Sequence, residues 1–285
     1  AKCAKCNKRR LFLKLDNNGL CFDCQLKKVE EEREKHRTQI KLRKRTEEQK
    51  RHQNIIRNAI NNIPTVDIIS TKEIIKDRAL YELKELKYSN ITPKGKYPEF
   101  VVVDTETTGI SAAKNKIVEL CAVRFKDSIP TEMFITLINP LTPIPLETTK
   151  VHGITNEMVE NSPTVKQIIK SFDSFVGASN IVAHNLDFDL RFIHKAGSSL
   201  VDTKRKYFCT MQQAQKLLKK PKVKWDKEYE FYDIDDNYDF DVENYKLGTL
   251  CDYFGIAIPD QHRAKADAFC AGLLFLQLIN FKQTK

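Results

Sequence analysis

The chain has 285 residues, of which 41% are hydrophobic, and its formal net charge at pH 7 is +10. This length suits one substantial domain and a smaller one, and the hydrophobic fraction supports a buried core. No run of about 18 apolar residues occurs and the first residues show no secretory leader pattern, so we expect a cytoplasmic protein with neither a membrane span nor a signal peptide.

The positive charge is confined to the first third of the chain. Residues 1–98 hold 25 lysines and arginines against 13 acidic residues, whereas residues 99–285 hold 23 against 25. A polyanion is the usual partner of such a basic segment, because neutralising phosphates releases counterions. A charged helix that is merely solvated is an equally open interpretation.

Four of the eight cysteines form two CxxC pairs within the first 25 residues. They are Cys3, Cys6, Cys21 and Cys24. Two CxxC turns on either side of a short hairpin bring four sulfurs onto one ion, as a tetrahedral zinc site requires. We therefore predict a zinc-ribbon-like module over residues 1–25 with one structural Zn²⁺; two disulfides or a redox CxxC are the alternatives. Such a module binds protein partners as readily as nucleic acid.

Residues 26–98 are predicted to form a basic helical spacer and a linker. Residues 25–62 contain no glycine or proline and no continuous apolar stripe. This composition predicts a solvated charged helix about 50 Å long, at roughly 1.5 Å per residue. A second helix is predicted over residues 71–87, and the prolines and glycine of residues 90–98 indicate a linker.

Residues 99–285 alternate between strand and helix patterns and are predicted to form the main domain. We expect strands at 99–105, 116–126, 132–138 and 180–184, and helices at 164–177, 187–196, 210–219, 246–254 and 264–280. This mixture predicts an α/β fold in which helices flank a mixed sheet.

Residues 225–245 depart from this pattern, with nine acidic residues, one lysine and seven aromatic residues. Their alternation predicts a β-hairpin insertion around Asp235, Asp236 and Asn237. The negative charge argues against contact with phosphates. The insertion could repel duplex, contact a partner protein or be merely solvated.

Two acidic residues, Asp104 and Glu106, end the first predicted strand. Residues two apart on a strand point to the same face, so the two carboxylates project together. Burying both is costly without compensation, and bound divalent cations are the simplest source of it. Carboxylate oxygens suit Mg²⁺ or Mn²⁺ better than zinc.

Four motifs follow one another in the main domain: DTETTG from Asp104, HGIT from His152, HNxxFDxxF from His184 and HxAxxDA from His262. Their order and content resemble the motifs of the DEDDh 3′→5′ exonucleases, the family that includes the proofreading epsilon subunit of bacterial DNA polymerase III. The resemblance covers about residues 99–280 and implies a ribonuclease H-like exonuclease fold.

The resemblance also implies a catalytic site. Its residues would be four acids that hold two Mg²⁺ or Mn²⁺ ions, together with a general base: Asp104, Glu106, Asp189, Asp267 and the base His262. Asp189 rather than Asp187 matches the family position, because it directly follows the phenylalanine of HNxxFD. Asp187 is better explained as an acid at a helix N-terminus. The expected substrate contacts are Thr107, Thr108, Gly109, His152 and Asn185.

The function implied by the resemblance is metal-dependent removal of nucleoside 5′-monophosphates from single-stranded or frayed DNA 3′ ends, in DNA repair or in proofreading during DNA replication. Two alternatives stay open. An exoribonuclease could use the same fold, because the motifs that hold metal do not read the 2′-OH. A nucleic-acid-binding adaptor could use the basic segment and the zinc module while the exonuclease domain is inert. A protein partner could bind the zinc module or the acidic insertion.

Overall fold

The structure is a computed structural model of the whole chain. It describes residues 4–6, 24, 27–28, 31, 35, 46–47, 50–51, 53–66, 97, 99–202, 204–226, 231–234, 239–256 and 263–281. The chain divides into two compact units, Ala1–Asn58 and Ala59–Lys285. No helix among the described residues is long and apolar enough to cross a membrane.

In the first unit, every described residue from Cys24 to Asn58 is helical, as the composition of that stretch predicts. Of the four predicted zinc ligands, Cys6 lies in an exposed turn and Cys24 is helical and buried. Cys3 and Cys21 lie outside the described residues, as do the predicted helix at 71–87 and most of the linker at 90–98. The zinc module therefore stays a prediction.

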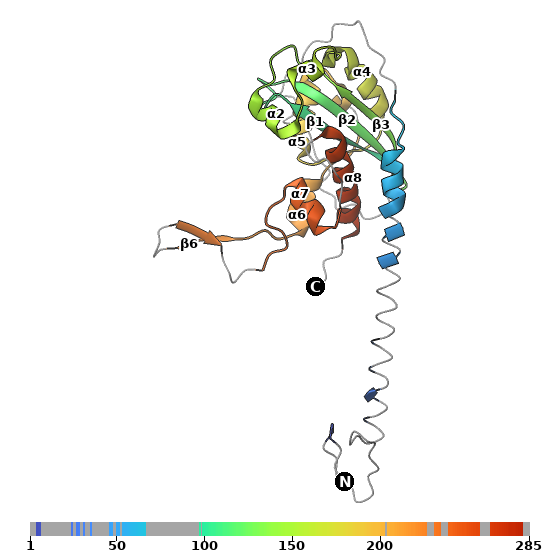
Figure 1. The fold of residues 1–285 in the computed structure, drawn as a ribbon, viewed down its shortest axis with the longest axis vertical. Coiled ribbons are helices and arrows are strands. Elements are labelled where there is room, and N and C mark those ends of the chain that lie inside the picture. Colours follow the sequence, from blue (N-terminus) through green and yellow to red (C-terminus); the bar gives the residue numbers. More distant parts are fainter. Residues whose placement is uncertain are drawn as a thin grey trace, which may run out of the picture. The chain divides into compact units, whose positions relative to one another are not determined.

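The second unit is built on a five-stranded mixed sheet with the strand order β3-β2-β1-β4-β5. The strands β1, β2 and β3 of this sheet are labelled in Figure 1. The antiparallel strands are β1 (Glu99–Thr107), β2 (Ile117–Lys126) and β3 (Ile129–Leu137). β4 (Ile181–Ala183) runs parallel to β1, and β5 (Tyr207–Cys209) runs parallel to β4. The predicted α/β fold with a mixed sheet is confirmed. β5 was not predicted, because three residues are too few to show a strand pattern.

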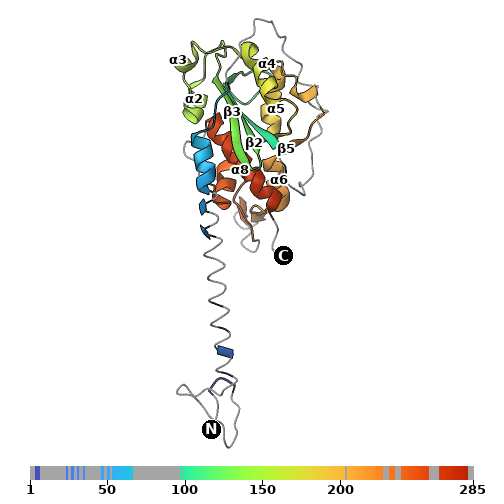
Figure 2. The same ribbon diagram turned by 90° about the vertical axis from the view of Figure 1, so that its right-hand side faces the viewer.

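Helices cover both faces of this sheet (Figures 1 and 2). On one face, α4 (Val165–Val176) and α5 (Leu186–Lys195) form a core with Val101 and Val103. On the other face, α8 (Ala264–Asn280) packs against Phe100 and Val102. Since strand residues alternate between faces, Asp104 and Glu106 continue the row of Phe100 and Val102 on the side of α8.

α8 lies close against the sheet at Gly272. A Cβ atom placed on this glycine would come within 2.5 Å of the Phe125 ring and 3.0 Å of the Val102 side chain. Only a residue without a side chain lets the helix backbone approach the strands so closely. The same helix carries Asp267 five residues earlier, so this contact helps to set how far that carboxylate lies from β1.

Shorter elements complete the unit: α2 (Leu146–His152), α3 (Asn156–Val159), η2 (Leu200–Asp202), α6 (Thr210–Leu217) and α7 (Leu247–Tyr253). A separate two-stranded sheet pairs β6 (Val223–Asp226) with β7 (Phe231–Ile234). The predicted hairpin is therefore present, but Asp226 pairs with Phe231, so its connection comprises residues 227–230 rather than residues around 235–237.

The outer edge of β3 is partly covered by residues 64–66. Thr65 forms a parallel bridge with Met133, which donates a hydrogen bond to the Pro64 carbonyl at 3.0 Å and accepts one from the Val66 amide at 2.9 Å. Ile60 and Ile63 pack against the core cluster under α8. Residues 59–66 thus belong to the same unit as the sheet.

Candidate active site

Two carboxylates stand at the carboxyl end of β1. Asp104 lies opposite Cys121 and Glu106 lies opposite Glu119 in the antiparallel pairing with β2. Both acidic side chains are half-buried, and both lie on the face that α8 covers. The strand geometry therefore brings these two acids together as the sequence predicts.

A third carboxylate comes from α8, whose first turn contains Asp267. Asp104, Glu106 and Asp267 each offer one carboxylate oxygen, and these oxygens lie within 4.8 Å of one another. Hard oxygen ligands at this spacing suit Mg²⁺ or Mn²⁺. Two sequence-distant elements thus form a candidate site for a divalent cation.

The fourth predicted acid, Asp189, approaches from the other side of the sheet on α5. It is 2% exposed, and the Thr105 hydroxyl donates a hydrogen bond to its Oδ1 at 2.9 Å. Asp189 is not one of the three acids grouped within 4.8 Å. The negative charge of Asp189 nevertheless helps to raise the pKa of Asp104, so the two carboxylates lie close enough to repel each other.

Burial and mutual repulsion favour the protonated forms of these acids. Burial is the main reason that the pKa of Glu106 rises to about 8, and the charges of Asp267, Glu119 and Asp189 add to it. Burial raises the pKa of Asp189 to about 7, although hydrogen bonds from Thr105 oppose the change. Burial and then the charge of Asp189 raise the pKa of Asp104 well above its usual value. A divalent cation would reverse these shifts by favouring the carboxylates.

Sequence reasoning missed a fifth carboxylate at the site. Glu119 on β2 is only 1% exposed and forms an ion pair with Arg263, in which Arg263 Nη2 lies 2.6 Å from Glu119 Oε1. The signal was present, because Glu119 interrupts the otherwise apolar segment IVELCAV. A buried acid in such a strand requires a partner, and the partner lies 144 residues further along the chain.

The predicted substrate segment Thr107–Gly109, where β1 ends and the chain bends, is held by side-chain hydrogen bonds. The Thr107 hydroxyl donates to the Gly109 carbonyl at 2.8 Å, and the Thr108 hydroxyl accepts from the Lys116 amide at 3.1 Å. Gly109 has φ +154°, and a Cβ there would lie 2.7 Å from the side chain of Asn115. Both threonine hydroxyls therefore already shape the loop beside Glu106.

Two further predicted substrate contacts have structural roles in this conformation. His152 ends α2 and is 4% exposed; its Nδ1 accepts a hydrogen bond from the Ile154 amide at 3.0 Å. Burial lowers the pKa of His152, which favours a neutral ring. Asn185 is exposed and takes the left-handed conformation (φ 60°) that turns the chain from β4 into α5. Asparagine tolerates this conformation better than most residues.

The predicted general base, His262, lies outside the described residues. The next residue, Arg263, is described and precedes the first turn of α8. Asp187, which the sequence analysis set apart from the metal ligands, lies in the first turn of α5 and pairs with Arg191 at 2.5 Å. Its half-exposed carboxylate is thus engaged one turn along its own helix.

The chain resembles exonucleases in sequence and in fold. Residues 101–275 match the family model RNase_T, which is described as an exonuclease family. The chain is 31% identical over 182 residues to DNA polymerase III subunit epsilon of Aquifex aeolicus. The aligned region covers 63% of this chain and 80% of that protein.

Larger relatives and solved structures also match about two thirds of this chain. The PolC-type DNA polymerase III of Caldanaerobacter subterraneus is 30% identical over 182 residues, which amount to 64% of this chain and only 12% of that protein. The chain therefore spans about a tenth of the length of the PolC-type relatives. E. coli exonuclease I in complex with a dT13 oligonucleotide has the same fold, with a TM-score of 0.50 at 16% identity over 64% of this chain and 41% of that one.

Proposed function

Because the chain belongs to the RNase_T family of exonucleases, we propose that it is a metal-dependent 3′→5′ exonuclease that removes nucleoside 5′-monophosphates from DNA 3′ ends. The observation that carries this proposal is the group of three carboxylate oxygens, from Asp104, Glu106 and Asp267, within 4.8 Å of one another. Divalent cations are the natural complement of such a group.

The donor set fits Mg²⁺ or Mn²⁺. It consists of carboxylate oxygens, and burial and repulsion between the acids raise the pKa values of Asp104 and Glu106. Arg263, the cation that lowers the pKa of Glu106, is itself bound to Glu119. Two bound divalent ions would activate a water and stabilise negative charge on the departing 3′ oxygen.

The residues of the chain take separate roles in this proposal. Asp104, Glu106 and Asp267 hold the cations, and Asp189, fixed by the Thr105 hydroxyl, completes the acidic set from α5. His262 accepts the proton of the attacking water, as a neutral imidazole does in general base catalysis. Thr107 and Thr108 at the end of β1 and His152 at the end of α2 line the approach of the terminal nucleotide in this proposal.

DNA is the proposed substrate because the relatives are subunits or parts of DNA polymerase III. We place the activity in DNA repair or in proofreading during replication in the cytoplasm. Single-stranded or frayed 3′ ends are the proposed form of the substrate. Contact with a protein partner, such as a polymerase subunit, through the zinc module or the acidic insertion at 225–245 is part of the same proposal.

A digestion experiment tests this function. With Mg²⁺ or Mn²⁺, the full chain is expected to shorten a 5′-labelled single-stranded DNA from its 3′ end one nucleotide at a time and to release nucleoside 5′-monophosphates. A matched RNA strand should be degraded more slowly. A large preference for RNA would instead favour the exoribonuclease, since the metal site does not distinguish the two sugars. Binding of both strands without nucleotide release would favour the inert adaptor.

The four cysteines of residues 1–25 are proposed to bind one structural Zn²⁺. Elemental analysis of the purified chain is expected to find about one zinc per chain, and Cys3→Ser should lower that ratio because one thiolate ligand is lost. Cys251→Ser is the control, since it removes a buried thiol of the second unit. Zinc content that does not change with Cys3→Ser would contradict the site.

A further inference from the structure

The residue opposite Glu106 on the neighbouring strand is another glutamate, Glu119. Its side chain is 1% exposed, so its carboxylate has almost no contact with water. A carboxylate buried to this degree requires hydrogen bonds or an opposite charge. Its placement next to Glu106, whose pKa it helps to raise, would otherwise disfavour the cluster.

The start of α8 supplies Glu119 with both hydrogen bonds and an opposite charge. Arg263 donates from Nη2 to Glu119 Oε1 at 2.6 Å and from Nε to Oε2 at 3.1 Å, which is a two-bond fork. The backbone amide of Ala264, the first residue of α8, donates to Oε2 at 3.0 Å. Arg263 itself offers no side-chain cap to the helix. Glu119 therefore caps α8 from a different element of the fold.

The capped turn is the one that carries Asp267. The Asp267 amide donates a hydrogen bond to the Arg263 carbonyl at 3.1 Å. Arg263 therefore binds Glu119 through its side chain and Asp267 through its backbone. β1 and β2 pair without interruption from Glu99–Lys126 to Glu106–Glu119, and the register shifts only after Glu106, so the pairing fixes Glu119 relative to Asp104 and Glu106. One carboxylate thus connects the two elements that supply the three grouped acids.

We propose that Glu119 is a positioning residue: by holding Arg263 and the first turn of α8 against β2, it sets the distance from Asp267 to Asp104 and Glu106 and so the affinity of the site for a divalent cation. This inference rests on the proposed function, because it assumes that the cluster binds the cation. Groups that orient metal ligands in this way typically contribute about 10-fold to 100-fold in affinity or activity.

Charge and position can be separated by variants that keep the charge. Glu119→Asp retains the carboxylate but shortens the side chain by one methylene, and Arg263→Lys retains the positive charge but loses the fork. If Glu119 and Arg263 act by positioning the first turn of α8, both variants bind the cation more weakly. If only charge matters, both bind like the wild type, whereas Glu119→Gln and Arg263→Gln shift the affinity in opposite directions, since one removes a negative and the other a positive charge.

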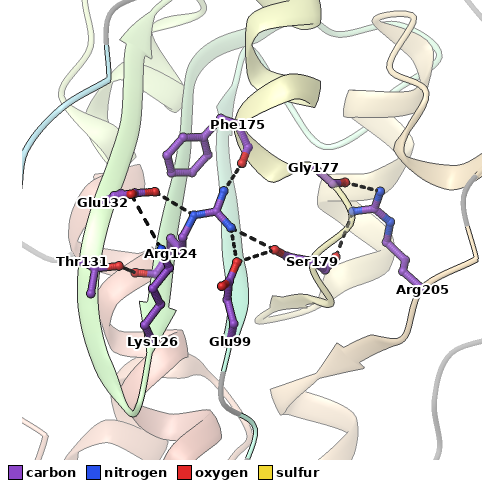
Figure 3. Close-up of polar contacts among 9 residues, drawn as sticks. All are labelled: Glu99, Arg124, Lys126, Thr131, Glu132, Phe175, Gly177, Ser179 and Arg205. Atoms are coloured by element: carbon purple, nitrogen blue, oxygen red, sulfur yellow. Dashed lines mark hydrogen bonds and ion pairs between the residues drawn. The ribbon is translucent and has the colours of Figure 1, made fainter.

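A matched control comes from the opposite end of β1. Glu99 pairs with Arg124 at 2.5 Å, within a network that also includes Glu132, Ser179 and the Phe175 carbonyl (Figure 3). Glu99→Gln breaks a glutamate–arginine pair on the same sheet without touching α8. The Glu99→Gln variant is expected to bind the cation with the affinity of the wild type.

The measurement is calorimetric titration with Mn²⁺ of the full-length chain, freed of Mg²⁺ and Mn²⁺ but with its proposed zinc retained, in the absence of DNA and at a temperature well below unfolding. Glu119→Asp and Arg263→Lys are expected to bind about 10-fold more weakly than the wild type. Their nuclease rates should recover as the Mn²⁺ concentration is raised, while urea unfolding without Mn²⁺ shows each variant to be fully folded at the assay temperature, so that the recovery reports cation binding rather than refolding. Circular dichroism checks that each variant is folded, and should Glu119→Asp not fold, Arg263→Lys decides alone.

Each outcome bears on the inference. Wild-type affinity in both charge-keeping variants overturns it, as does equal weakening by Glu99→Gln. Opposite shifts in Glu119→Gln and Arg263→Gln, with the charge-keeping variants unchanged, would assign the effect to charge. A wild type that binds no Mn²⁺ overturns the proposed metal site and this inference together, whereas a wild type that binds Mn²⁺ with the same affinity as the charge-keeping variants overturns this inference alone.

Discussion

Asp104→Asn is expected to lower the rate of nucleotide release by about 1,000-fold, because stabilisation of the transition-state charge by bound cations amounts to several kcal/mol and about 1.4 kcal/mol corresponds to a factor of ten. Asp104 belongs to the grouped acids and is the one whose pKa is raised by every other acid of the site. Single-turnover digestion of a 5′-labelled strand at saturating Mg²⁺ measures the loss.

The same substitution should make the metal-free protein more stable at pH 8. An amide in place of the carboxylate removes the repulsion with Asp189 and Glu106. The control is Asp187→Asn on α5, which makes the same charge change at a half-exposed acid paired with Arg191. Asp187→Asn should keep nearly the wild-type rate. A rate for Asp104→Asn within threefold of the wild type would contradict the proposed site.

The metal-free protein is expected to lose stability as the pH rises from about 4 to about 8. The pKa of Glu106 is about 8 in the folded protein against 4.5 for an unperturbed glutamate, and that of Asp189 is about 7 against 3.8. Between these values the folded state binds more protons than the unfolded state, so the free energy of unfolding falls as the pH rises. The loss should be on the order of a few kcal/mol, complete above the folded pKa values.

Urea unfolding in a chelator between pH 5 and pH 9 measures this slope. Added Mn²⁺ should reduce or reverse it, because the cation binds the carboxylates of the folded state and competes with their protons. Glu106→Gln should flatten the slope in the chelator, since it removes the residue with a pKa of about 8. Stability that rises with pH in the chelator would show that the acids are not held in the buried, mutually repelling arrangement.

The sequence predicted best those features that depend on near neighbours in the chain. Asp104 and Glu106 share a face because alternate strand residues do so, and the predicted strand at 99–105 differs from β1 by two residues at its end. The helix predicted at 264–280 coincides with α8, whose apolar residues leave no other interpretation. Asp267 was predicted as a site residue only from the resemblance to the DEDDh exonucleases, since no pattern in the neighbouring residues places it beside β1.

The missed features depend on contacts between distant segments. The role of Glu119 follows from Arg263, which is 144 residues away, and nothing in either segment alone names the other. α2 and α3 were not predicted, because they comprise only seven and four residues, and the segment LETTKVH of α2 also contains β-branched residues that lower helix propensity. Pairing between β6 and β7, rather than the turn signal at Asp235–Asn237, determined where the hairpin connection lies.

The segment that pairs with Met133 bears on how the exonuclease part could be separated from the rest of the chain. The motifs suggest cutting at Glu99, but that cut would remove the backbone groups of Pro64 and Val66 that satisfy Met133 on the outer strand. A shortened protein that begins there would present an unprotected strand edge, ready to pair with another molecule, and would tend to aggregate. A boundary before Ala59 keeps the sheet's own cover in place.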